Sequence, residues 1–156
     1  MPQVPPGLHL VAPDSSINTY DLIELAHVGV VYTSTVGLEM AMAGVPVIVT
    51  GATHYRGRGF THDPASAGEY GETLDRLVAD PPGRRLPDQQ IELAQRYAYR
   101  FFFEYPFPYP WHLIGFWDDI ERRPPPDILS APGLEPYRPT LDALLGEPID
   151  WAGRAS

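Results

Sequence analysis

Two kinds of hydrophobic pattern alternate along the first 50 residues. Runs of consecutive apolar residues rich in Val and Ile are typical of buried strands, and apolar residues spaced three or four apart are typical of helices. By these patterns, we expect strands at residues 8–12, 28–32 and 45–50, and helices at 20–26 and 36–43. Strands and helices that alternate across short loops predict a doubly wound, mostly parallel α/β sheet with helices on both faces.

Beyond residue 50 the pattern predicts helices and then an irregular end. Helices are expected at residues 67–78, 88–103 and 111–120, separated by proline-containing breaks. From Pro124 onward the prolines predict an extended tail with one helical turn at 141–145. The expected organisation is an α/β domain over residues 1–121, with its core at 8–80 and C-terminal helices at 88–120, and a Pro-rich tail over 122–156.

The charge and composition of the chain limit which kinds of ligand and binding partner are expected. The chain has 20 acidic and 11 basic residues, so no nucleic-acid partner is expected and any membrane contact would be peripheral. Cysteine is absent and no His, Asp or Glu pair has metal-ligand spacing, so we expect no disulfide, metal or resident cofactor. No apolar run approaches the ~20 residues of a transmembrane helix, and the first residues do not resemble a signal peptide, which favours the cytoplasm.

Three polar loops follow the expected strands, at residues 14–18, 33–37 and 51–63. In an open α/β sheet, ligands bind beyond the carboxyl ends of the strands, where these loops would lie. The second loop leads directly into a helix, whose first N–H groups can hold a phosphate together with the hydroxyls of Ser34 and Thr35. Gly37 would let a ligand approach closely. The alternative is that Ser34 or Thr35 is an ordinary N-cap.

Glu39 is a lone carboxylate in an otherwise apolar helix and lies four residues after Thr35. Residues four apart share one helix face, so this carboxylate is placed to accept hydrogen bonds from two ribose hydroxyls. The alternative is an exposed glutamate that the helix dipole favours.

The third loop carries candidates for acid–base chemistry and anion binding. His54, His62 and Asp63 are the candidates for catalysis, because imidazole titrates near neutral pH and a carboxylate can accept a proton. Arg56 or Arg58 could pair with a phosphate or a sugar carboxylate. For each of these residues the alternative is a solvated loop side chain.

Taken together, several motifs resemble those of a known family. They are Tyr20-Asp21-Leu22-Ile23, Ser34-Thr35-Val36-Gly37-Leu38-Glu39, Gly44-Val45-Pro46-Val47 and Gly51. This set resembles the C-terminal, Rossmann-like half of two-domain (GT-B) glycosyltransferases and of the related sugar-nucleotide 2-epimerases. Residues 55–63 are similar to the corresponding segment of capsular polysaccharide biosynthesis proteins, which include Kdo transferases.

The resemblance implies a nucleotide-sugar donor as substrate. It assigns the donor phosphates to Ser34, Thr35 and Gly37, and the ribose to Glu39. It places Ser16 and Tyr20 on the nucleotide side, and Tyr55, Arg56 and Thr61 at the border of the sugar. In the family an N-terminal domain supplies acceptor contacts and often the catalytic base, so we expect catalysis here to need such a domain or a partner subunit.

Two other functions fit the same residues. One is a sugar-nucleotide 2-epimerase-like enzyme or a hydrolase of related fold, and the other is a non-catalytic module that binds a nucleotide. The sequence leaves the base, sugar, acceptor and stereochemical outcome open, because fold-level similarity does not determine them.

Overall fold

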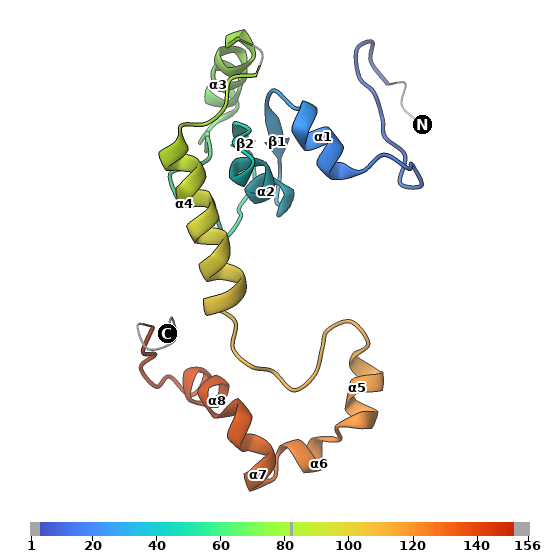
Figure 1. Ribbon diagram of the computed structural model, residues 1–156, viewed down its shortest axis with the longest axis vertical. Coiled ribbons are helices and arrows are strands. Elements are labelled where there is room, and N and C mark those ends of the chain that lie inside the picture. Colours follow the sequence, from blue (N-terminus) through green and yellow to red (C-terminus); the bar gives the residue numbers. More distant parts are fainter. Residues whose placement is uncertain (1–3, 82, 152–156) are drawn as a thin grey trace. The chain divides into compact units, whose positions relative to one another are not determined.

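The structure is a computed structural model, and it describes residues 4–81 and 83–151 (Figure 1). The chain divides into two compact units, Met1–Ala98 and Tyr99–Ser156. The described residues have a mixed secondary structure, with 47% of them in helices and a sheet of two short parallel strands.

The sheet forms around the most apolar part of the chain. Strand β1 (Gly29–Val31) pairs in parallel with β2 (Val47–Val49), in the register Gly29 to Val47, and helix α2 (Val36–Met42) connects them. His62 extends the pairing on the other side of β2, where its N–H donates to Val47 O at 2.8 Å and its O accepts from Val49 N at 2.9 Å. These elements confirm the strand–helix–strand unit expected between residues 28 and 50.

The expected strand at residues 8–12 is not formed. The segment lies between two turns, closed by hydrogen bonds from Leu8 N to Pro5 O and from Ser15 N to Ala12 O. Leu8 and Leu10 are 62% and 78% exposed, and β1 is the outer strand of the sheet among the described residues. A strand needs a neighbour to pair its backbone groups, and an apolar pattern alone does not supply one.

Side-chain caps and a glycine mark ends of the helices in the first unit. In α1 (Thr19–Leu25), Asn18 Oδ1 accepts the Tyr20 N–H at 3.0 Å. Helix α2 is followed by Gly44 in the left-handed region, at a φ of 83°. Helix α3 (Ala67–Ala79) is capped by Ser66, whose Oγ accepts from Glu69 N, and the Glu69 carboxylate accepts from Ala65 N, just before the cap.

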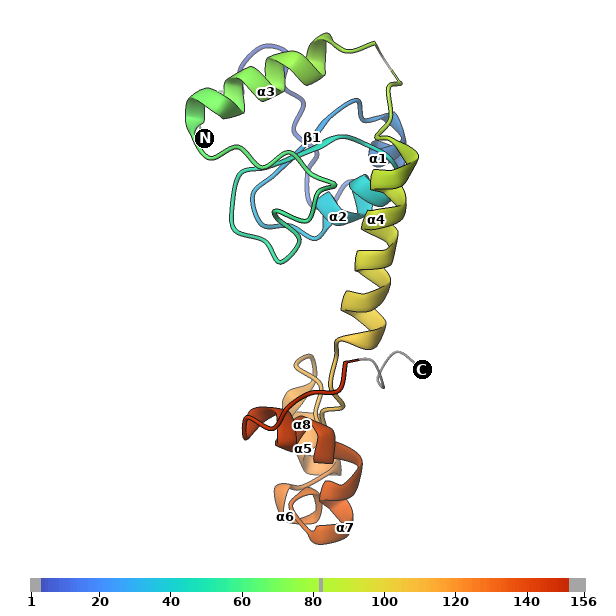
Figure 2. The same cartoon turned by 90° about the vertical axis from the view of Figure 1, so that its left-hand side faces the viewer.

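Helix α4 (Asp88–Tyr99) packs beside the C-terminal end of α2 (Figure 2). Leu86 N, just before it, donates to Gly44 O at 2.7 Å, and Gln95 Nε2 donates to Met42 O at 3.4 Å. The first unit has one hydrophobic core, to which α2, β2, the loop after β2 and α4 all contribute. Its largest fully buried side chains are Tyr55 and Phe60, so the 51–63 loop is anchored by two aromatic rings.

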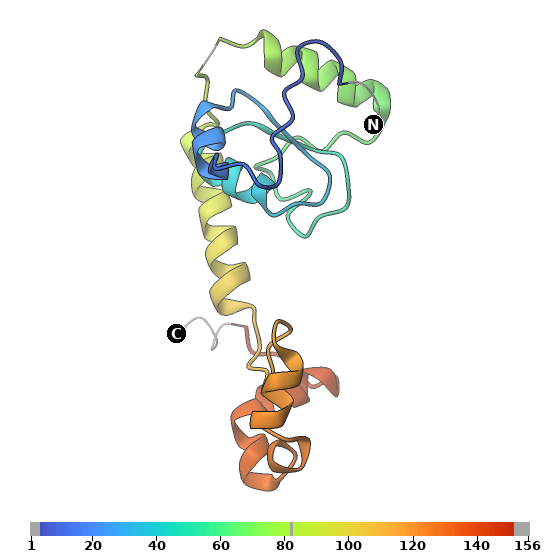
Figure 3. The same cartoon turned by 90° about the vertical axis from the view of Figure 1, so that its right-hand side faces the viewer.

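The second unit is helical where an irregular tail was expected. After a π-helical turn at Arg100–Glu104 come the helices α5 (Phe116–Arg122), α6 (Pro125–Ile128), α7 (Ala131–Leu134) and α8 (Arg138–Leu144), with a 3-10 turn at Glu135–Tyr137 (Figure 3). The expectation of an extended tail from Pro124 is therefore wrong for residues 125–140, whereas α8 confirms the helical turn expected at 141–145. Prolines there occupy first-turn positions, which need no backbone N–H.

The helix expected at 111–120 begins five residues later, at Phe116, behind Gly115 with a φ of 75°. Asp119 folds the preceding segment back, because its Oδ2 accepts the His112 N–H at 2.9 Å. This backbone hydrogen bond is the main cause that lowers the pKa of the Asp119 carboxyl. Across the described residues, no helix is long and apolar enough to span a bilayer.

Candidate functional site

The turn from β1 into α2 carries the exposed hydroxyls of Thr33, Ser34 and Thr35. Ser34 Oγ accepts the Val36 N–H at 3.3 Å, so it caps one donor at the start of α2. Thr35 occupies the N-cap position of α2 without a side-chain capping bond. The turn therefore presents hydroxyls at the amino end of a helix, at the carboxyl edge of the sheet.

Gly37 faces the protein interior. A Cβ at this position would lie 2.8 Å from Val31 Cγ2 and would overlap the hydroxyl of Tyr55. The Tyr55 hydroxyl donates to Ser34 O at 2.5 Å. The packing of Tyr55 under the turn thus accounts for the glycine, whereas we had expected it to give a ligand access.

Glu39 and Tyr20, which come from separate elements, meet beside this turn. The Tyr20 hydroxyl lies near the Glu39 carboxylate, and hydrogen bonding to this carboxylate, followed by its negative charge, raises the pKa of Tyr20. Glu39 is half-buried and Tyr20 is 60% exposed. Ser16 lies two residues before the α1 N-cap and is also exposed.

The side chains of Tyr55 and Arg56 are directed into the protein, where they hold the 51–63 loop in place. The Tyr55 ring is fully buried, and burial raises the pKa of its hydroxyl. Arg56 Nη1 donates to Val49 O and Gly51 O, and its Nη2 donates to Asp63 O and Pro64 O. Four hydrogen bonds to carbonyls thus hold the guanidinium that the resemblance placed at the border of the sugar.

Thr61 and Asp63 close the same loop on itself. Thr61 Oγ1 donates to Asp63 Oδ1 at 2.8 Å, and the Gly57 N–H donates to Asp63 Oδ2 at 2.8 Å. Both carboxylate oxygens of this candidate catalytic residue therefore accept hydrogen bonds from its own loop.

The two candidate histidines have different surroundings. His54 Nδ1 lies 3.0 Å from the Tyr97 hydroxyl, and burial, followed by the charge of Arg58, lowers the pKa of His54. His62 pairs its backbone with β2. Burial is also the main cause that lowers the pKa of His62, with Arg76 adding to it and Asp63 opposing it. Both shifts favour neutral imidazole near pH 7.

A pocket of about 360 Å³ opens beyond the carboxyl end of β2. Thr50, which follows β2, connects it to β1, because its N–H and its hydroxyl both donate to Val31 O. The pocket is lined by Thr50, Pro64, Ala65, Ser66, Ala67 and Tyr70. Thr50, Ser66 and Tyr70 are not among the predicted site residues, although the position of Thr50 just after a buried strand is a signal that could have identified it.

The pocket and the β1–α2 turn are neighbours, since Gly51 N donates to Tyr32 O at 3.1 Å. Within residues 4–81 and 83–151, no cluster of three or more His, Asp and Glu side chains is arranged to hold a metal ion.

Comparisons of the chain with protein-family models, curated proteins and solved structures find no match.

Proposed function

We propose that this chain is the nucleotide-sugar-binding half of a GT-B glycosyltransferase that builds bacterial capsule or another surface polysaccharide. The proposal includes a Rossmann-like, doubly wound sheet in the complete enzyme and a cytoplasmic location. Catalysis would require an N-terminal domain or a partner subunit, which would hold the acceptor.

The position of Glu39 is the observation that carries the proposal, because this half-buried carboxylate lies on α2 one turn after Thr35 and near the Tyr20 hydroxyl. A carboxylate that lies among hydroxyls in this way is suited to accept hydrogen bonds from the two hydroxyls of a ribose. The neighbouring turn supplies the hydroxyls of Ser34 and Thr35 for a diphosphate. The pocket beside Thr50 would have room for part of the sugar next to them.

We test the proposal by calorimetric titration with CMP-, UDP- and GDP-linked sugars. One of these nucleotides is expected to bind, and Glu39→Ala should weaken that binding by about 1–3 kcal/mol, because the variant leaves ligand hydroxyls without their acceptor. Glu72→Ala is the matched control, since Glu72 is exposed on α3, away from the turn. Equal affinities of the wild type and Glu39→Ala would exclude Glu39 from the site.

A second candidate is a non-catalytic module that binds the same ligand. It is favoured by the engagement of Arg56 and Asp63 in hydrogen bonds of their own loop, which leaves fewer groups for chemistry. An assay of nucleotide release from the bound donor separates the two. A glycosyltransferase half releases nucleotide once its partner and acceptor are supplied, whereas the module binds the donor without turnover.

A further inference from the structure

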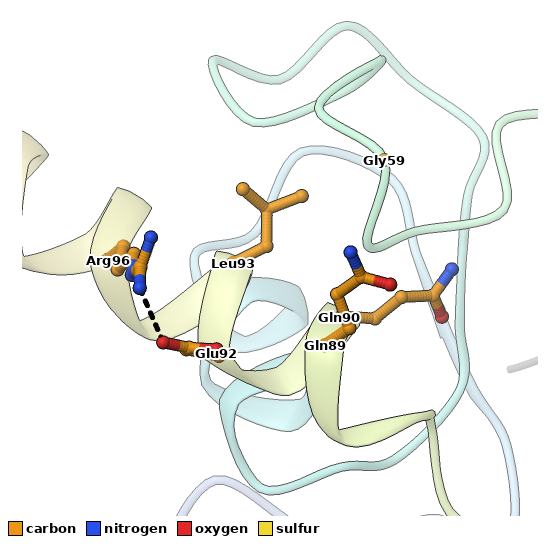
Figure 4. Close-up of a pocket in the computed structure, with 6 residues that line it drawn as sticks. All are labelled: Gly59, Gln89, Gln90, Glu92, Leu93 and Arg96. Atoms are coloured by element: carbon orange, nitrogen blue, oxygen red, sulfur yellow. Dashed lines mark hydrogen bonds and ion pairs between the residues drawn. The ribbon is translucent and has the colours of Figure 1, made fainter.

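A second pocket of the first unit shares no residue with the edge of the sheet described above. It has a volume of about 380 Å³ and lies between the glycine-containing segment of the 51–63 loop and the first turns of α4 (Figure 4). Its lining residues are Gly59, Gln89, Gln90, Glu92, Leu93 and Arg96. The volume falls within the roughly 300–1,000 Å³ of small-molecule sites.

The two walls of this pocket are held in place by their neighbours. Phe60, next to Gly59, is fully buried, and its ring lies 5.7 Å from that of Tyr97 on α4. On the other side of Gly59, the Arg58 guanidinium lies 5.7 Å from the centre of the same Tyr97 ring. The residues on both sides of Gly59 therefore pack against Tyr97 of α4, so a ligand would not have to order this part of the loop.

The lining chemistry favours a neutral ligand with many hydroxyls. Gln89 and Gln90 extend their amides from α4 toward the segment that carries Gly59 (Figure 4). Among the described residues neither amide has a hydrogen-bond partner in the protein, and each offers donors and an acceptor. Glu92 and Arg96 neutralise each other in an ion pair of 2.5 Å.

Leu93 and Gly59 complete the site in a way that suits a sugar ring. Leu93 points toward the loop and offers an apolar surface to the C–H groups of a ring (Figure 4). Gly59 has a φ of 90°, which disfavours a side chain at this point and leaves the backbone accessible. The lining residues carry no uncompensated positive charge with which a phosphorylated or acidic ligand could pair.

We infer that this pocket binds a neutral saccharide. Its role as a product subsite rests on the proposed function, but saccharide binding itself does not require the nucleotide. The amides of Gln89 and Gln90 bind the hydroxyls, and Leu93 packs against the ring.

Nuclear magnetic resonance of the full chain tests the inference. We would follow the side-chain amide signals of Gln89, Gln90 and Gln95 during titration with galactose, N-acetylglucosamine and N-acetyllactosamine, and with glucose 1-phosphate as the charged comparison. The neutral saccharides should shift the signals of Gln89 and Gln90 but not that of Gln95, whose Nε2 faces Met42 O. Glucose 1-phosphate should shift them less at equal concentration.

The double variant Gln89→Ala, Gln90→Ala should bind the best saccharide at least about fivefold more weakly, because each lost hydrogen bond contributes a factor of that order. Gln95→Ala, on the same helix, should bind it as the wild type does. Unmoved Gln89 and Gln90 signals, or a double variant of wild-type affinity, would overturn the inference. Nucleotide titrations of the same samples report on the proposed function separately, so either one can fail while the other stands.

Discussion

Single polar residues hold the loop between β2 and α3 in its shape. Arg56 donates to four carbonyls that come from both ends of this loop, and Asp63 accepts from Gly57 and Thr61 within it. Half-buried carbonyls need such donors, because an unpaired polar group away from water is costly. The loop is therefore a fixed wall beside the candidate site.

Replacing Arg56 should destabilise the first unit. Arg56→Met removes all four hydrogen bonds and leaves the carbonyls unpaired, so we expect the free energy of unfolding to fall by about 2–4 kcal/mol. Arg58→Met is the matched control two residues away. Its guanidinium is exposed and lies over the Tyr97 ring, so its loss should cost about 1 kcal/mol or less.

Urea denaturation followed by circular dichroism measures both variants. If Arg56→Met were as stable as Arg58→Met, the carbonyls would not depend on Arg56, and its guanidinium would be available to a ligand.

At the scale of elements, α2 packs closely on β1 and on the loop after β2. Gly37, in the first turn of α2, is a point of close approach, opposite Val31 and the Tyr55 hydroxyl. Tyr55 in turn holds the carbonyl of Ser34. The orientation of the candidate phosphate-binding turn thus depends on a helix–strand contact that only a glycine permits.

Gly37→Ala should push α2 away from β1 and lower the free energy of unfolding by about 1–3 kcal/mol, the usual cost of overpacking. Gly71→Ala is the control, because Gly71 lies inside α3 with no heavy atom within 4 Å of an added Cβ. This variant should gain about 0.5–1 kcal/mol from the better helix propensity of alanine.

Thermal unfolding of both variants checks the expectation. A Gly37→Ala protein at least as stable as the wild type would show that α2 can shift without cost.

At the scale of the whole molecule, all candidate site residues lie in the unit Met1–Ala98. That unit contains the sheet and the core formed by α2, β2, the 51–63 loop and α4. The second unit, Tyr99–Ser156, consists of short helices and aromatic contacts such as the stacking of Tyr105 on Trp151 at 5.0 Å. Nucleotide binding is therefore expected to reside in the first unit.

A chain that ends at Ala98 should unfold in one cooperative transition and bind the same nucleotide sugar within about twofold of the full-length affinity, a change of roughly 0.4 kcal/mol. Differential scanning calorimetry and isothermal titration check the two statements. A folded 1–98 chain that has lost nucleotide binding would show that the second unit contributes to the site.

Local pattern determined much of the secondary structure. Consecutive Val and Ile residues specified β1 and β2, and Asn18 and Gly44 marked helix ends, because these signals act through neighbouring backbone groups. The same signals located the turn of Ser34 and Thr35 at the end of β1. Residues 8–12 show the limit, since their strand-like pattern has no partner strand to pair with.

The tertiary structure alone decided which polar residues of the loops face inward. Nothing local distinguishes Arg56 from Arg58, yet one donates to four carbonyls and the other lies exposed over a ring. Gly37 is likewise explained by Tyr55, which lies 18 positions further along the sequence. These roles depend on contacts between distant segments, which a hydrophobic pattern does not encode.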